Sequence, residues 1–163
     1  MTTKVSTGRF FEDFAIGQHL VHAVPRTVHG GDLAMYMALT GDRNPLASST
    51  DLARSFGLVR EVVPDLLVFH LVFGKSVPDV SHNATANLGY ADVRFLRPVY
   101  PGDTLSAESE VIGLREVSSG DAGVVDRDAG RSRSRASTEP VRADCFDRAK
   151  RDASARQARH ARS

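Results

Sequence analysis

The chain has 163 residues, 41% of them hydrophobic and 25% charged, which is the size and composition of one soluble globular domain and excludes a fibrous or wholly disordered protein. A single cysteine, Cys145, excludes an internal disulfide and a multi-cysteine zinc site, and suits a reducing compartment. The sequence shows neither a signal-peptide pattern nor an apolar run long enough to span a bilayer, so we expect a cytoplasmic protein with no membrane partner.

Charge and apolar residues are distributed unevenly along the chain. Residues 1–116 hold 10 Lys and Arg against 13 Asp and Glu, whereas residues 117–163 hold 11 against 7. All 13 Leu and both Ile precede residue 117. A segment with so little apolar surface cannot offset the entropy of ordering. We therefore predict a domain in residues 1–125 and a basic tail in residues 126–163, which is either disordered or translated out of frame.

The first half of the chain predicts one strand and two short helices. Residues 18–24 alternate as a strand does, and Pro25 is expected to end it. The run Gly30-Gly31-Asp32 opens an amphipathic pattern that Gly41 closes, with Asp32 suited to capping. Residues 49–57 show the same features on a smaller scale, with a Ser-Thr-Asp start and a glycine stop.

A longer apolar run follows at residues 66–73, interrupted only by His70. Periodicity alone leaves both a helix and a strand open. The preceding Pro64-Asp65 favours a helix, because proline suits the first turn and an acid suits the positive end of the helix dipole. Since the run is apolar on every side, we expect this helix to be buried all round.

Alternating residues between 84 and 112 predict two strands. The sequence Pro-Gly-Asp-Thr at residues 101–104 is typical of a turn, so we expect the two strands to form an antiparallel pair joined by it. The order of elements predicts an α+β fold in which an antiparallel sheet wraps one central helix.

Residues 36–46, Y-M-A-L-T-G-D-R-N-P-L, resemble the hydratase motif of MaoC-like dehydratases. These are hotdog-fold enzymes that add water to acyl-CoA thioesters or remove it. The longer run from Gly8 to about Val125 resembles the first half of mesaconyl-CoA hydratases, also called β-methylmalyl-CoA dehydratases, which are double-hotdog proteins. The resemblance implies a hotdog that is incomplete at its C-terminus, an acyl-CoA substrate, no cofactor, and a homo-oligomer or pairing with a second hotdog.

The resemblance also implies a site, with one departure from the family pattern. Hydration of an enoyl thioester needs a base that activates water, an acid that protonates C2 and hydrogen-bond donors that stabilise the thioester oxygen. Single-hotdog members use an Asp and a His of the motif. Asp42 matches the first, but Ala47 stands at the position of the second. Two functions stay open: a hydro-lyase, and a non-catalytic half that binds acyl-CoA or pairs with a partner.

Five residues are the site candidates. Asp42 and His70 are the catalytic candidates, and Asn44, Gly89 and Tyr90 are the substrate-binding candidates. Each has a structural alternative: Asp42 and Asn44 suit a turn, His70 suits a core histidine with its hydrogen bonds satisfied, and Gly89 suits a β-bulge.

The basic tail supports a third function, a binding protein for nucleic acid. Residues 131–135 read R-S-R-S-R, a pattern typical of a patch that binds an anionic surface. However, Phe146 is the only aromatic residue after Tyr100, so the tail has few side chains on which bases could stack. We expect no nucleic-acid partner. The histidines show no metal-ligand spacing with one another or with acids, so we expect no metal.

Overall fold

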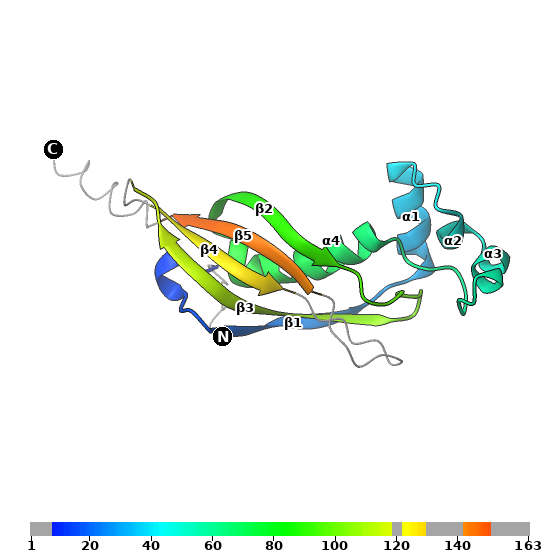
Figure 1. The fold of residues 1–163 in the computed structure, drawn as a ribbon, viewed down its shortest axis with the longest axis horizontal. Coiled ribbons are helices and arrows are strands. Elements are labelled where there is room, and N and C mark those ends of the chain that lie inside the picture. The colour runs from blue at the N-terminus through cyan, green and yellow to red at the C-terminus, as the bar shows by residue number, and fades with distance from the viewer. Residues whose placement is uncertain (1–7, 119–121, 130–141, 151–163) are drawn as a thin grey trace, which may run out of the picture.

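The structure is a computed structural model that describes residues 8–118, 122–129 and 142–150. Five strands form one sheet in the order β1-β3-β4-β5-β2, in which every neighbouring pair is antiparallel (Figure 1). The strands are β1 (His19–Thr27), β2 (Ala84–Arg94), β3 (Thr104–Glu116), β4 (Ala122–Ala129) and β5 (Arg142–Lys150).

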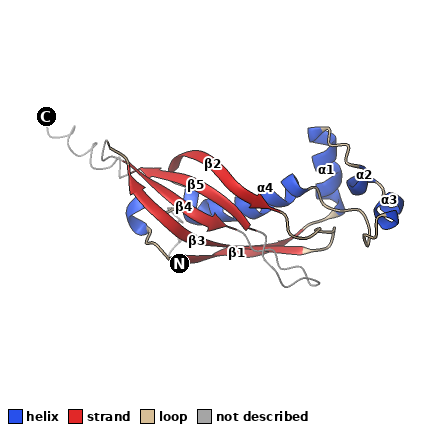
Figure 2. Cartoon of the chain, viewed as in Figure 1, coloured by secondary structure: helices blue, strands red, loops and turns tan. Residues whose placement is uncertain are grey.

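The helices fall into two groups around this sheet (Figure 2). Helix α4 (Asp65–Ser76) runs along the sheet and contacts β3 and β1, and a short π-helix, η2 (Val77–Ser81), continues it. Near the start of α4, away from most of the sheet, lie α1 (Gly30–Thr40), α2 (Pro45–Ser48) and α3 (Thr50–Ser55). The expected α+β hotdog fold, a sheet around a central helix, is confirmed.

The central helix is where we expected it, but it is not buried all round. Its side chains Leu67, Val68 and Val72 are buried against the sheet. Leu66 is 59% exposed, and His70 is exposed as well. The prediction of complete burial is wrong because the sheet covers only one side of α4. The other side is an apolar surface that the described residues leave open in part.

The core consists of two clusters at the two ends of the central helix. The first joins the start of α4 to α1 and to β3, and the second joins η2 to the N-terminal 3-10 helix η1 (Phe11–Asp13) and the sheet. Members of the first are Val28, Leu33, Val63, Leu67, Val68, Val72, Val99, Leu105 and Ala107, and those of the second are Phe14, Leu20, Val80, Val111 and Val125.

The short helices begin and end as their sequences predict. Asp32 Oδ2 accepts the backbone N–H of His29 at 2.9 Å and so closes the first turn of α1. Gly41 ends α1 in the left-handed region, with φ of 69°. The Ser49 hydroxyl accepts the N–H of Leu52 at 3.2 Å and caps α3.

Strand β1 continues past Pro25, so the prediction that this proline ends it is wrong. The register with β3 shifts between His22 and Arg26, which marks a bulge, and a bulge tolerates the missing N–H of proline. Val24 lies within this irregular stretch with φ of 59°, and its carbonyl accepts a hydrogen bond from Lys75 on α4. The helix therefore contacts the irregular part of the strand directly.

The predicted pairing of the two later strands is also wrong. The turn at residues 100–103 forms, with the Asp103 N–H donating to the Tyr100 carbonyl at 3.0 Å. However, β3 pairs with β1 and β4, whereas β2 lies at the far edge beside β5. The connection of residues 95–103 carries the chain from β2 at one edge of the sheet to β3, which lies beside the opposite edge strand β1.

Part of the predicted tail lies in the sheet. Strand β4 continues to Ala129, and β5 pairs with both β4 and β2. The boundary at residue 125 and the out-of-frame hypothesis stay predictions, and residues 130–141 and 151–163 lie outside the described residues. No described helix has the length and apolar character needed to cross a bilayer.

Candidate functional site

A cavity of about 330 Å³ lies at the N-terminal end of α4, a volume in the range of small-molecule sites. Three polar residues line it: Asn44 before α2, Asp65 in the first turn of α4, and Arg97 in the connection after β2. The remaining wall is apolar and consists of Leu46, Leu58, Val62, Val63, Pro64, Phe95, Leu96 and Pro98.

The motif loop reaches this cavity through Asn44. Asp42 Oδ1 accepts the N–H of Asn44 at 2.9 Å, and Asn44 Oδ1 accepts the N–H of Leu46 at 3.0 Å. Both side chains thus shape the loop, as the turn alternative predicted, and Asn44 caps α2. Because the amide oxygen of Asn44 is engaged with its own loop, the Nδ2 group is what it offers to a ligand, and Nδ2 is a donor.

Among the described residues that line the cavity, Asp65 is the only one with a carboxylate. Burial raises the pKa of its carboxyl group above the usual value of an aspartate. The sequence pattern marked Asp65 only as a helix-start acid. No local signal could have placed it beside Asn44 and Arg97, because the cavity forms where three segments distant in sequence meet.

Ala47, where the resemblance places the histidine of the motif, is 1% exposed. It lies in α2 with its backbone N–H bonded to the Asn44 carbonyl at 3.0 Å. None of the cavity-lining residues in the described part of the chain is a histidine. The proton-transfer chemistry available there therefore differs from that of an Asp–His pair.

Of the five candidates only Asn44 lines the cavity. Asp42, in the loop before it, does not line it, and neither do His70 on α4 or Gly89 and Tyr90 on β2. His70 is exposed, so the alternative of a core histidine is wrong. The Tyr90 ring packs edge-on against Phe69 and Phe73, with centroids 4.9 and 5.5 Å apart. The register of β2 shifts just before Gly89, which confirms the β-bulge there.

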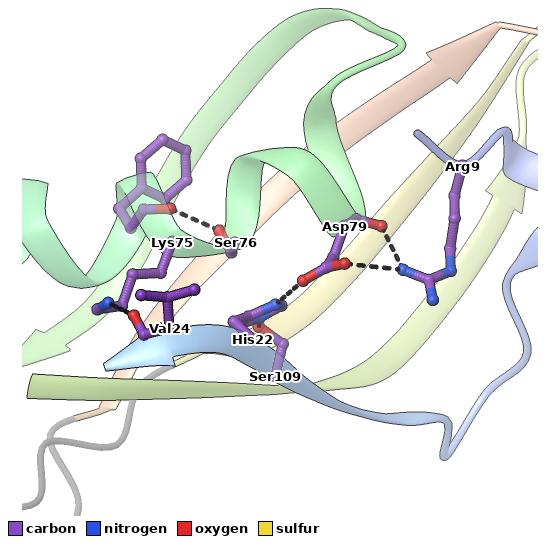
Figure 3. A network of polar contacts seen from close by, with 8 residues as sticks. Arg9, His22, Val24, Lys75, Ser76, Asp79 and Ser109 are labelled. Atoms are coloured by element: carbon purple, nitrogen blue, oxygen red, sulfur yellow. Dashed lines mark hydrogen bonds and ion pairs between the residues drawn. The ribbon is translucent and has the colours of Figure 1, made fainter. Parts of the chain in front are cut away.

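A second polar cluster, which we call the His22 network, lies at the other end of the central helix (Figure 3). His22 Nδ1 is 2.8 Å from Asp79 Oδ2, and His22 Nε2 is 2.7 Å from Ser109 Oγ. Arg9 Nη1 donates to the Asp79 carbonyl at 2.7 Å and lies 3.6 Å from Asp79 Oδ1. The Nδ1 atom of His22 thus faces a carboxylate and Nε2 faces a hydroxyl group, and which of the two nitrogens donates depends on the tautomer.

The order Asp–His–Ser is that of a hydrolase triad, but the site lacks access. Ser109 is 2% exposed and His22 is 3% exposed. Ser109 does not line the cavity at α4, nor the second one of about 430 Å³ on the other face of the sheet. A nucleophile needs a substrate beside it, so the network joins η2 to the sheet rather than performing acyl transfer. Sequence reasoning missed it because its members come from separate elements.

Within the described ranges, no group of three or more His, Cys, Asp or Glu side chains is arranged to hold a metal ion. The cavity at α4 presents one carboxylate, one amide and one guanidinium. This set can exchange a proton and donate hydrogen bonds, and it is poorly suited to a divalent cation, which prefers several oxygen ligands.

Comparison with curated proteins gives two strong matches. The chain is 59% identical over 122 residues to a mesaconyl-CoA hydratase of Cereibacter sphaeroides, covering 75% of this chain and 36% of that protein. It is 58% identical over 125 residues to a beta-methylmalyl-CoA dehydratase of Chloroflexus aurantiacus, covering 77% of this chain and 36% of that protein. The chain thus spans about a third of the length of these relatives, within their N-terminal half.

Solved structures agree in fold. A MaoC domain protein dehydratase from Chloroflexus aurantiacus superposes with a TM-score of 0.85 at 48% identity, over 92% of this chain and 42% of that one. A Mycobacterium tuberculosis protein described as having a double hotdog fold superposes with a TM-score of 0.81 at 26% identity, over 90% of this chain and 45% of that one. The family model for the MaoC-like domain matches residues 12–130. The chain therefore belongs to the MaoC-like dehydratase family.

Proposed function

We propose that this chain takes part in the reversible hydration of an enoyl-CoA thioester, with mesaconyl-CoA and β-methylmalyl-CoA as the substrate pair. The observation that carries the proposal is the cavity at the start of α4, which the hydratase-motif loop lines through Asn44. The names of the two curated relatives described above supply the acyl group. Both acyl groups derive from branched dicarboxylic acids, so each thioester keeps one free carboxylate.

The reaction needs two proton movements. A base takes a proton from water while the hydroxyl oxygen bonds to C3, and an acid delivers a proton to C2, so the atoms balance without a redox cofactor. Asp42 is suited to hold the water, since only its Oδ1 is bonded to Asn44 and Oδ2 can accept from water. Asp65 is suited to exchange the second proton, because partial burial raises the pKa of its carboxyl group above the usual value of an aspartate.

The thioester oxygen needs hydrogen-bond donors as negative charge develops on it. The Asn44 amide supplies one donor, and the positive end of the α4 dipole lies at the same wall of the cavity. Apolar side chains form the rest of the cavity wall beside these groups. This arrangement favours an enolate-like intermediate over the neutral thioester.

His70, Gly89 and Tyr90 belong to a second part of the proposed site. They lie along the open side of α4 and on β2, where the described residues leave Leu66 59% and Leu88 53% exposed. We propose that a second hotdog, either another copy or a second half, covers this side. The acyl-CoA would then lie between the two hotdogs, with His70 available as a further proton donor.

A second candidate function is a non-catalytic acyl-CoA-binding half. The buried Ala47 at the position of the motif histidine favours it, because loss of one member of a proton-transfer pair costs on the order of 10²- to 10⁴-fold in rate. In that case the chain binds the thioester, and a partner hotdog supplies the chemistry.

One assay separates the two functions. Hydration is followed through the loss of enoyl-thioester absorbance, with Asp42→Asn as the test variant and Asp51→Asn, an exposed first-turn acid on α3, as the control. The hydro-lyase predicts turnover that Asp42→Asn reduces and Asp51→Asn preserves. Binding of the thioester without turnover would support the second function, and undiminished turnover by Asp42→Asn would contradict the role of Asp42.

A further inference from the structure

We propose that residues 23–26 of β1 form an edge block, in which a bulge tied to α4 by Lys75 prevents this edge of the sheet from pairing with a second copy of the chain. This property is independent of the proposed function, because it concerns the backbone edge of the sheet and not the cavity at α4.

Strand β1 lies at an edge of the sheet, because it pairs with β3 and with no other described strand. An edge strand presents unpaired N–H and C=O groups, with which a strand of another chain can pair. Proteins prevent such pairing with bulges, prolines and charged residues on the edge strand. Strand β1 combines all three within residues 23–26, which hold the bulge, Pro25 and Arg26.

The bulge has two local costs. The register shifts between His22 and Arg26, whose partners on β3 are two residues apart, so residues 23–25 lie opposite Ser106 alone. Val24 has φ of 59°, and across the described ranges it is the one non-glycine residue in the left-handed region, which a β-branched side chain disfavours. The hydroxyl oxygen of Ser106 is buried and has no hydrogen-bond partner in the described structure. A regular strand would have neither the strained backbone nor the unpaired hydroxyl.

Contacts from two helices hold the bulge in place. The Lys75 ammonium donates a hydrogen bond to the Val24 carbonyl and so ties α4 to the strained residue (Figure 3). Partial burial lowers the pKa of Lys75, and the positive charge of Arg26 lowers it further, which is consistent with Lys75 lying against the same stretch of β1. Arg26 itself is directed to α1, where its Nη2 is 2.6 Å from Asp32 Oδ1.

The opposite edge strand, β2, lacks these features. Residues 84–94 include no proline, and the one arginine, Arg94, is the last residue of the strand. The register of β2 with β5 also shifts, yet all non-glycine residues of β2 keep a negative φ. The block is therefore a property of β1 and not a general feature of the edges of this sheet.

Sedimentation velocity of the full chain over a range of concentrations tests the block. The double variant Pro25→Thr/Arg26→Thr restores the missing N–H and removes the charge from the edge. Two such edges can then pair about a two-fold axis, so the weight-average mass should rise about two-fold above that of the wild type at the same concentration. Arg115→Thr removes the same charge from the interior strand β3 and should leave the mass unchanged.

Two valines on β1 test the strained conformation. Val24 is 76% exposed and Val21 is 70% exposed, so neither loses much packing when glycine replaces it. Glycine adopts a positive φ without strain, so Val24→Gly should keep or raise Tm. Val21→Gly, in the regular part of the strand, should lower Tm by roughly 2–4 °C, since glycine weakens an ordinary strand.

Amide hydrogen exchange tests the tie from α4. Lys75→Met removes the donor and keeps an apolar stem of similar length. The amides of Val24 and Arg26 should then exchange about 10-fold faster, as expected for the loss of one hydrogen bond from a charged donor. The amides of Leu20 and Val21, which lie before the bulge, should be unchanged.

Each other outcome overturns the edge block or one of its parts. An unchanged mass of the folded double variant would show that residues 23–26 do not block the edge, and an equal rise in Arg115→Thr would assign the association to lost charge. Equal losses of Tm in the two glycine variants would contradict the strained conformation, and unchanged exchange in Lys75→Met would remove the tie. If the double variant does not fold, Lys75→Met at high concentration replaces it, because release of the bulge should raise the mass and a constant mass would overturn the block.

Discussion

The two ends of the central helix carry two polar clusters of opposite character. At the far end, His22, Asp79 and Ser109 satisfy one another at 2.7 and 2.8 Å, and the imidazole is 3% exposed. At the near end, Asn44, Asp65 and Arg97 come from three separate segments and face a cavity of about 330 Å³. The first cluster is buried and its members bond to one another, whereas the second borders a cavity. An aspartate is present in both clusters, and its surroundings differ between them.

The largest effect on the rate of hydration is expected for Asp65→Asn. If Asp65 exchanges a proton with the substrate, its loss should lower kcat/KM for hydration about 10²- to 10⁴-fold, while stability falls little or rises because the neutral amide is easier to bury. The wild-type pH profile should show a limb above the usual pKa of aspartate that the variant lacks. A variant with full activity and an unchanged profile would remove Asp65 from the mechanism.

His22→Leu tests the other cluster. Loss of both imidazole hydrogen bonds in a buried setting should lower the free energy of unfolding by about 2–4 kcal/mol, measured in urea. The activity per folded molecule should not change. His19→Gln is the control on the same strand, because His19 is 53% exposed and its contact with Glu108 is 3.3 Å long. A specific loss of activity in His22→Leu would place the network in the site.

Ala47→His restores the histidine of the family motif and tests whether the site can use an Asp–His pair. Because Ala47 is 1% exposed, an imidazole there overpacks α2 and should cost about 1–3 kcal/mol of stability without raising the hydration rate. Ala47→Ser is a smaller control at the same position. A marked rise in rate would show that the site accommodates the missing histidine after all.

The smallest effect is expected for the thermal stability of Glu61→Gln. Glu61 lies near the cavity but does not line it. Hydrogen bonds from Arg60, and next from Thr50 at 2.6 Å, lower the pKa of Glu61 from 4.5 to about 2. A lowered acid pKa stabilises the fold above the unfolded-state value, and this contribution disappears as the pH falls through the folded-state value. Glu61→Gln should therefore lower Tm slightly at pH 7 and not at all near pH 2, as a thermal scan against pH would reveal. An equal difference at both pH values would contradict the electrostatic cause.

Local signals predicted much of the fold. The caps at Ser49 and Gly41 and the start of α4 are where the residues indicated, because capping and helix starts depend on neighbouring residues only. The strand pairing was not predictable in this way. The turn at residues 101–104 looks like a hairpin, but pairing depends on where the sheet closes around α4, which no local pattern contains.

Only those residues of the candidate site that belong to a sequence motif could be predicted. Asn44 was found through the motif loop, and it lines the cavity. Asp65 and Arg97 belong to no motif, and they join Asn44 only when the chain folds. His70 was expected in the core because its neighbours in sequence are apolar. It is exposed because a one-layer sheet leaves one side of a helix uncovered.

The most direct test of the contrast between the two clusters is a titration of the isotope-labelled protein with butyryl-CoA, followed by backbone amide chemical shifts. We predict shift changes concentrated at residues 44, 46, 58, 62, 63, 65 and 95–97, with the amides of His22, Asp79 and Ser109 unmoved. Changes centred on the His22 network, or saturating binding that leaves the cavity residues unchanged, would contradict it.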